Sequence, residues 1–203
     1  MSALLFFIIV FLTFPVFFVP KSYKYRYSLL LVVCGVLLTS FWSYQVLSGS
    51  GSALTVSCVK PIPDSIPAFV IDRLTAFFIV VINITVLVGL LYSKGYLKQY
   101  YATKNSLRFS IHYFSYLWLY LSMLMVVMIR TGLSFLIVWE IMALSSFLLV
   151  IFDAEDTSVM KTGISYLIQM HAGMFFLLIA FLIPGKETGE MSFDSLAVYF
   201  SGH

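Results

Sequence analysis

Long apolar runs separated by short polar clusters make up most of the 203-residue chain. The runs are continuous, without the alternation of apolar and polar positions that membrane-spanning strands require, so they predict helices. A helix needs roughly 20 residues to cross the ~30 Å hydrocarbon core of a bilayer. Runs close to this length occupy residues 3–19, 28–47, 68–92, 110–129, 132–152 and 163–183. We therefore predict an all-α, polytopic bundle of about six transmembrane helices, forming a single domain over residues 1–203.

Three local features refine this plan. Pro15 falls inside the first run, where its ring removes a backbone donor and is expected to kink the helix. Only Arg130 and Thr131 separate the fourth and fifth runs, so these two helices must be antiparallel neighbours. After the sixth run, apolar residues recur at spacings of three and four, which predicts a short surface helix over residues 192–201. These apolar residues are Phe193, Leu196, Ala197 and Phe200.

The basic residues indicate in which direction the chain crosses the membrane. Two loops are rich in lysine and arginine, KSYKYRY after the first run and SKGYLKQYYATKNSLR after the third. The loop over residues 48–67 carries only Lys60 against Asp64. Because positively charged loops face the cytoplasm, the first two loops are predicted to be cytoplasmic. The amino terminus is then outside and, after six crossings, so is the carboxyl terminus.

Composition indicates a membrane protein, and the sequence lacks the motifs of metal, cofactor and nucleophilic sites. Apolar residues make up 61% of the chain and charged residues 10%, far from the usage of soluble domains. The first run has no basic segment before it and no cleavage site after it, so we expect it to be retained. The sequence has no glycine-rich phosphate loop, no cluster with metal-ligand spacing and no nucleophile constellation. We therefore expect no metal, no cofactor and no catalytic redox site in this chain.

Glu140 lies near the middle of the fifth run, where an ionised carboxylate is costly. Its neighbours three and four residues away are all apolar, so its own helix offers no charged partner. A partner on another helix, a partner on another chain, water or a proton must stabilise this carboxyl group. Glu140 is therefore a candidate for proton translocation, and the alternative is a protonated acid with a structural role.

His171, in the sixth run, is the second titratable group expected at depth. With 1.5 Å of rise per residue in two antiparallel helices, Glu140 and His171 differ in depth by only ~6 Å. They can meet, directly or through one water, if the two helices pack together. A histidine titrates near neutral pH and can pass protons on, so the pair is a candidate relay. The alternative is that His171 only donates a hydrogen bond to a neighbouring helix.

Other polar residues within the runs are supporting candidates. Asp72 and Arg73 open the third run, where interfacial anchoring or a local ion pair is expected, and Asn83 lies deeper in that run. Gln169 belongs to a stripe of small and polar residues on the sixth run, roughly opposite His171. Such stripes favour close helix packing and interhelical hydrogen bonds. The stripe consists of Thr162, Ser165, Gln169 and Gly173.

Four segments carry a family resemblance. They are IDRLTAFF and LYSKGYL at the two ends of the third run, WEIMALSSFLLV in the fifth, and KTGISYLIQMHAG leading into the sixth. With them the sequence resembles the antiporter-like, proton-translocating membrane subunits of respiratory complex I and of the related membrane-bound hydrogenases. The segment EIMAL is most similar to the large membrane subunit of formate hydrogenlyase and hydrogenase-4 complexes. The resemblance covers the chain from the third run to its end.

The resemblance implies a role for Glu140 and a set of partners. In the family, the glutamate at this position is implied to pair with a lysine on a broken seventh helix and to take part in proton transfer. That lysine does not occur in these 203 residues, so a separate chain or a missing segment is expected to supply the remaining helices. Other membrane-arm subunits and the lipid bilayer are further expected partners, and nucleic acid is not. The implied location is the inner (cytoplasmic) membrane of a prokaryote.

Three functions stay open at this point. The first is the amino-terminal part of a proton-translocating subunit of a complex I-related NADH–quinone oxidoreductase or membrane-bound hydrogenase. The second is a stand-alone transporter half that dimerises around a substrate cavity, which needs several polar residues converging at the membrane midplane. The third is an assembly module that fills the membrane arm without pumping. An isolated glutamate among apolar neighbours argues against the third.

Overall fold

The computed structural model describes residues 2–49, 54–56, 69–153, 157–189 and 191–201. Almost all of this part of the chain is helical, and the elements follow the apolar runs closely. In chain order they are α1 (Ser2–Phe11), the 3₁₀ helix η1 (Phe14–Phe17), α2 (Lys24–Ser48), β1 (Leu54–Val56), β2 (Phe69–Ile71), α3 (Arg73–Lys98), α4 (Ser106–Met128), α5 (Gly132–Val150), the 3₁₀ helix η2 (Ile151–Asp153), α6 (Thr157–Thr188) and α7 (Phe193–Ser201).

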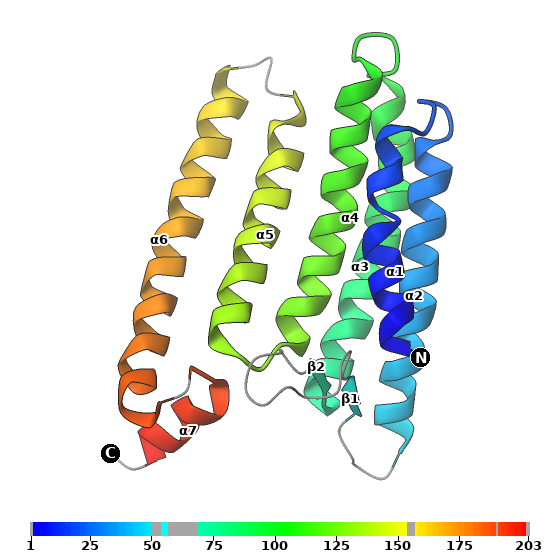
Figure 1. Ribbon diagram of the computed structural model, residues 1–203. Coiled ribbons are helices and arrows are strands. Elements are labelled where there is room, and N and C mark those ends of the chain that lie inside the picture. The colour runs from blue at the N-terminus through cyan, green and yellow to red at the C-terminus, as the bar shows by residue number, and fades with distance from the viewer. Residues whose placement is uncertain (1, 50–53, 57–68, 154–156, 190, 202–203) are drawn as a thin grey trace.

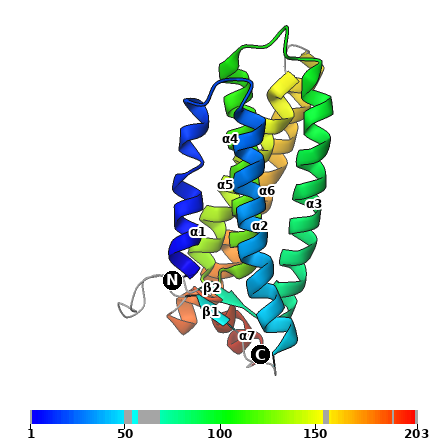
Figure 2. The same cartoon turned by 90° about the vertical axis from the view of Figure 1, so that its right-hand side faces the viewer.

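Among the described residues, α2 to α6 are each long and apolar enough to cross a membrane. A shorter apolar segment, made of α1 and η1, lies beside α2 (Figure 2). Together these segments confirm the predicted all-α membrane bundle with about six spans. The first run is not one continuous helix, however. The α-helix ends at Phe11, and Pro15 lies in the first turn of η1, because proline cannot donate the hydrogen bond that an α-helix interior needs.

The helices form a central group with an extension on one side. Figure 1 shows α5 and α6 side by side on one flank of α4, with α1, α2 and α3 on the other. Both chain termini lie at the end of the bundle that holds β1, β2 and α7, as an even number of crossings requires. We call this the terminal end. The opposite end, which holds the loops over residues 21–23 and 99–105, is the basic end.

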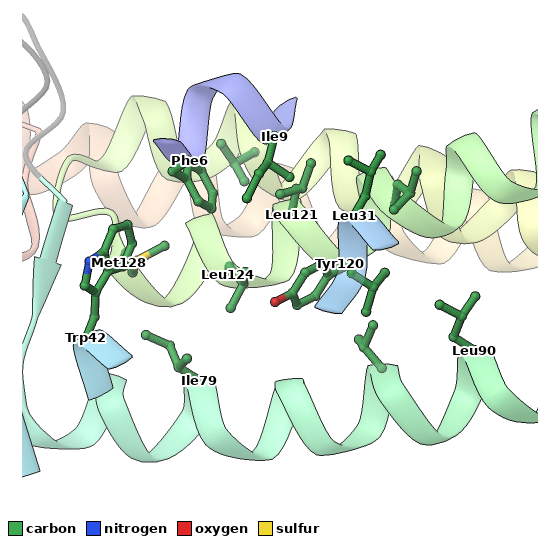
Figure 3. Packing of buried hydrophobic residues seen from close by; sticks show 14 of the residues in the cluster. Phe6, Ile9, Leu31, Trp42, Ile79, Leu90, Tyr120, Leu121, Leu124 and Met128 are labelled. Atoms are coloured by element: carbon green, nitrogen blue, oxygen red, sulfur yellow. The ribbon is translucent and has the colours of Figure 1, made fainter. Parts of the chain in front are cut away.

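The hydrophobic core lies mainly among α1 to α4. Tyr120 of α4 is almost fully buried and belongs to the same cluster as Leu31 of α2, Ile79 of α3 and Leu124 of α4 (Figure 3). Large apolar side chains on the outer faces of the helices are instead exposed, as expected where lipid replaces water around the bundle. By contrast, α6 buries few of its side chains against the rest of the described chain.

A two-stranded antiparallel ribbon at the terminal end was not predicted. Residues of β1 pair with residues of β2, with Leu54 opposite Ile71 and Val56 opposite Phe69. The third run was predicted to be helical from residue 68, but the helix begins only at Arg73. The carboxylate of Asp72 accepts a hydrogen bond from the amide of Thr75 at 2.7 Å and so caps the helix.

The backbone between α4 and α5 continues this pairing across the terminal end. Phe69 forms a bridge with Ile129, and Thr131 forms a bridge with Ser192. The amide of Gly132 donates to the carbonyl of Met191 at 2.7 Å, and the amide of Phe193 donates to the carbonyl of Arg130 at 3.2 Å. Backbone hydrogen bonds therefore join three segments that are distant in sequence: the start of α3, the turn between α4 and α5, and the start of α7.

The surface helix predicted over residues 192–201 is confirmed as α7. Its first turn is held by a reciprocal cap, in which the Ser195 amide donates to the Ser192 hydroxyl and the Ser192 amide donates to the Ser195 hydroxyl. The ring of Phe193 packs edge-on against Phe135 of α5 and Phe181 of α6. The contact places α7 over the terminal ends of α5 and α6 (Figure 1).

Candidate functional site

Glu140 of α5 and His171 of α6 meet directly. The carboxylate Oε1 of Glu140 lies 2.8 Å from Nε2 of His171. The side chain of Glu140 is 26% exposed and that of His171 is 42% exposed, so the pair is accessible from outside the described chain. The prediction that the two residues share a depth and can touch is thus confirmed. Their role in proton transfer stays a prediction.

The other ring nitrogen of His171 has a partner on its own helix. Nδ1 lies 2.8 Å from the carbonyl oxygen of Leu167, one helical turn earlier. A carbonyl oxygen can only accept a hydrogen bond, so Nδ1 must carry a hydrogen. This contact fixes both the orientation of the ring and the nitrogen that faces Glu140.

Two glycines let α5 and α6 approach on either side of the pair. At the terminal end, a Cβ atom on Gly132 would lie 2.6 Å from the ring of Phe181 on α6. At the basic end, a Cβ atom on Gly163 would lie 2.9 Å from Ile151 and 3.3 Å from Phe147. All three distances are shorter than normal contacts between carbon atoms. Because glycine has no side chain, α5 and α6 can lie close enough for Glu140 and His171 to form a direct contact.

Gly132→Ala is expected to destabilise the chain by about 1–3 kcal/mol, because the new methyl group must displace the buried ring of Phe181. Gly173→Ala on α6 is the matched control, since a methyl group added there would meet nothing within 4 Å. Thermal unfolding in detergent should show a lower midpoint for Gly132→Ala and an unchanged or higher one for Gly173→Ala. Equal midpoints for the two variants would contradict close packing at Gly132.

Asp72 forms an ion pair with Arg130, the residue in the turn between α4 and α5. Its sequence neighbour Arg73, predicted as a supporting residue, is exposed on the first turn of α3. Sequence reasoning treated Arg130 only as part of a tight turn. No local pattern in the sequence indicates this pair, because 58 positions separate the two residues along the chain. The ion pair links α3 to the α4–α5 turn at the terminal end, away from Glu140.

The environment of Asp72 predicts a pH dependence of stability. Burial alone would raise the pKa of Asp72, but hydrogen bonds from Thr75 and the nearby guanidinium of Arg130 together hold it below its ordinary value. A depressed carboxyl pKa stabilises the folded state above the ordinary pKa of about 4, and this stabilisation is lost as pH falls through the folded-state value. Since both side chains are more than one-third exposed, the ion pair contributes less than about 1 kcal/mol.

Asp72→Asn keeps a helix-capping side chain but removes the charge, so its unfolding midpoint should lie slightly below that of the unmodified chain at neutral pH. The difference should shrink as pH falls below the ordinary carboxyl value of about 4 and through the lower folded-state pKa, because the aspartate then takes up a proton. Asp72→Ala, which also loses the cap, should cost about 1 kcal/mol more at every pH. Thermal unfolding of the three proteins over this pH range is the measurement. A difference between Asp72→Asn and the unmodified chain that does not change with pH would show that the charge is unimportant.

Asn83 belongs to a separate polar cluster within the core. Its amide nitrogen donates to the hydroxyls of Thr39 and Ser40, each at 3.0 Å, and its amide oxygen accepts from the hydroxyl of Tyr120 at 2.9 Å. The cluster joins α2, α3 and α4, and Asn83, Thr39 and Tyr120 are all buried. These hydrogen bonds engage neither Glu140 nor His171. The structure thus separates Asn83 from the Glu140–His171 pair.

Gln169 lies on the exposed side of α6. Its amide nitrogen is 3.4 Å from the hydroxyl of Ser165. Both line an open depression of about 400 Å³, whose other lining residues are Lys161, Thr162 and Tyr166. Gly173 belongs to the same predicted stripe, and a Cβ atom added to it would meet no atom of another described helix within 4 Å. The stripe therefore packs against no helix of the described chain at this point, and its predicted packing role is untested.

Comparison with known proteins gives one matching family and related chains. Residues 130–203 match the family described as NADH:quinone oxidoreductase/Mrp antiporter, TM. This match covers α5, α6 and α7, the part of the chain that holds Glu140 and His171. Hydrogenase-4 component B of Escherichia coli (strain K12) is 33% identical over 124 residues. The alignment covers 61% of this chain and 18% of that protein.

A solved structure has the same fold. The match is to a chain in the structure of the membrane-bound sulfane sulfur reductase (MBS), an archaeal respiratory membrane complex, with a TM-score of 0.79. The sequences are 19% identical, and the match covers 97% of this chain and 39% of that chain. This chain therefore spans well under half the length of either of these relatives.

Proposed function

We propose that the chain is the amino-terminal part of a proton-translocating subunit of the antiporter-like family that its residues 130–203 match. The parent assembly is a complex I-related NADH–quinone oxidoreductase or a membrane-bound hydrogenase in the inner membrane of a prokaryote. The family match over residues 130–203 and the similarity to hydrogenase-4 component B support this proposal. The direct contact between Glu140 and His171 is the observation that carries it.

The geometry of the pair supports single-proton transfer. Since Nδ1 donates to the Leu167 carbonyl, only Nε2 and the carboxyl oxygen exchange a proton with each other. One proton on this line gives two forms. In the first, a protonated Glu140 donates to a neutral His171, and in the second, a charged imidazolium donates to a carboxylate. A shift of the hydrogen from Oε1 to Nε2 converts the first form into the second without moving any heavy atom.

Removal of that proton makes the contact between Glu140 and His171 repulsive. The carboxylate Oε1 and the bare Nε2 would then be two acceptors facing each other at 2.8 Å, which is repulsive. Water or a donor from outside must enter, or the side chains must separate. The partial exposure of both side chains gives such a donor access. Loss of the proton is therefore coupled to a local rearrangement, which is a property a proton-translocating site needs.

A cation supplied from outside the 203 residues would also act on the Glu140–His171 pair. A cation within ~4–6 Å of Glu140 favours the carboxylate form and so favours transfer of the proton toward His171. We propose that a lysine on the remaining helices of the parent subunit provides this cation. Arrival and departure of the cation would then drive the proton between the two residues.

The stand-alone transporter half is a weaker candidate. It requires polar side chains that converge on a shared cavity near the midplane. Asn83 instead lies within the α2–α3–α4 core, and Gln169 lies on the exposed side of α6. Proton pumping by the assembled complex, with single substitutions at Glu140 and at His171, tests the proposed function.

A further inference from the structure

The basic end carries a concentrated positive charge. The segments over residues 20–28 and 92–110 contain no aspartate and no glutamate. Their basic residues divide into an inward group and an outward group according to burial and contacts. The inward group is Lys21, Lys24 and Lys104, and the outward group is Arg26, Lys94, Lys98 and Arg108.

The inward lysines hold the ends of the helices together. Lys21 donates to the carbonyls of Tyr101 and Lys104, both at 2.7 Å, and Lys104 donates to the carbonyl of Phe152 at 2.8 Å. Lys24 is fully buried and donates to the Val16 carbonyl and the Ser110 hydroxyl. Carbonyls that follow the last turn of a helix carry partial negative charge and attract cations. The charge of the inward group is therefore engaged within the protein.

Within the described part of the chain, the side chains of the outward group donate no hydrogen bond to a backbone carbonyl. The side chains of all four residues are exposed. Arg26 lies over the ring of Tyr23, with 5.8 Å from Cζ to the ring centre. Lys94 of α3 lies over the ring of Tyr25 of α2, with 5.7 Å from Nζ to the ring centre. A cation over a tyrosine face is held in place but keeps its donors available.

Tyrosine rings extend this surface along α3. Tyr92 stacks on Tyr96, and Tyr96 contacts Tyr100, each at the spacing of one helical turn. Tyr23 is 55% exposed and Tyr92 is 73% exposed. Rings with an apolar body and a polar tip are suited to the headgroup level of a bilayer. Arg26 lies in the first turn of α2, Lys94 and Lys98 in the last turns of α3, and Arg108 in the first turn of α4. Figure 2 shows that the start of α2 and the end of α3 lie at the same end of the bundle.

We propose that Arg26, Lys94, Lys98 and Arg108 form a binding surface for the phosphate headgroups of anionic phospholipids. Charge complementarity carries the assignment, because the two segments supply cations and tyrosines without a carboxylate of their own. The acidic residue Asp153 of η2 lies at the same end but follows Phe152, whose carbonyl binds Lys104 of the inward group. The tyrosines place the surface at headgroup depth, where the partner is lipid rather than free phosphate. Arg26 and Lys94 form its centre, since each is positioned by a tyrosine ring.

Native mass spectrometry of the detergent-solubilised chain, titrated with phosphatidylglycerol or with phosphatidylcholine, tests the surface. The unmodified chain should retain phosphatidylglycerol in preference to phosphatidylcholine, and added salt should weaken the preference. Arg26→Gln with Lys94→Gln should weaken phosphatidylglycerol binding by roughly 10- to 30-fold, at about fivefold for each removed charge. Lys161→Gln with Lys186→Gln removes the same charge from exposed positions on α6 and should change binding by less than about twofold.

Several outcomes would overturn the proposal. Absence of a phosphatidylglycerol preference in the unmodified chain would do so even if the double variant failed to fold. Equal losses in the two double variants would assign the effect to net charge rather than to this surface. Displacement of the lipid by inorganic phosphate at the same concentration would identify a free-phosphate site instead.

Discussion

Glu140→Gln is expected to lower proton translocation by the assembled complex by about 100-fold or more, the usual contribution of a positioned proton-transfer group. Glutamine has nearly the same shape and can still hydrogen-bond to His171, so packing between α5 and α6 should be kept. It has no proton to exchange at neutral pH, and the shared proton position between Oε1 and Nε2 is lost. The measurement is acidification of inverted membrane vesicles, normalised to electron-transfer rate and to the amount of subunit in the membrane.

Glu187→Gln is the matched control for this substitution. Glu187 is an exposed carboxylate in the last turns of the same helix that carries His171, at the terminal end. The same chemical change there should leave pumping unaltered. Normal pumping by the Glu140→Gln complex would refute the coupling role of Glu140, and failure of the complex to assemble would point to a structural role.

His171→Gln should reduce pumping by a similar factor if the histidine is a relay, because glutamine can hydrogen-bond to Glu140 but cannot carry a proton onward. If His171 is only a hydrogen-bonded anchor, this variant should pump normally. Gln169→Ala, a change on the exposed side of the same helix, serves as the control. The experiment therefore separates the two roles that the sequence left open for His171.

Combining Glu140→Gln with His171→Gln tests whether the two residues act in one step. Residues that share one proton act as a unit, so their effects are not additive. Glu140→Gln combined with His171→Gln should pump no worse than either single variant within about twofold. Losses that multiply would show that the two residues act in separate steps.

The sequence predicted that Glu140 and His171 lie at a similar depth in the membrane, but it could not predict that their side chains face each other. Helical rise and antiparallel topology fix how far each residue lies from its helix end, and that estimate agrees with the contact. Rotation of the two helices about their axes decides whether the side chains face each other. That rotation depends on packing at Gly132 and Gly163, whose neighbours Phe181 and Phe147 come from the opposite helix.

Helix boundaries differ from the predicted runs for a physical reason. The sixth run was predicted over residues 163–183, whereas α6 extends from Thr157 to Thr188. Hydropathy reports the part of a helix that matches the hydrocarbon core, and the hydrogen-bonded helix continues into the headgroup region. Its end is set locally, by Gly189 in the left-handed conformation with φ of 79°.

Contacts between residues that are distant in the sequence could not be predicted from it. The strands β1 and β2 contain three residues each, too short for a periodic signal. Asp72 was expected to have its ion-pair partner nearby in sequence, but the partner, Arg130, belongs to another loop. The four segments that suggested the antiporter-like family contain Asp72, Glu140 and His171. The resemblance is confirmed by the comparisons, but it contained no information on the Asp72–Arg130 contact.

The backbone bridges at the terminal end also impose an order on biosynthesis. The amide of Gly132 pairs with the carbonyl of Met191, and the carbonyl of Arg130 pairs with the amide of Phe193. While the ribosome is still making α6, neither partner exists, so the first turn of α5 enters the membrane without these two hydrogen bonds. The α4–α5 turn is therefore joined to the start of α7 only after α6 has been inserted and residues 191–193 have emerged.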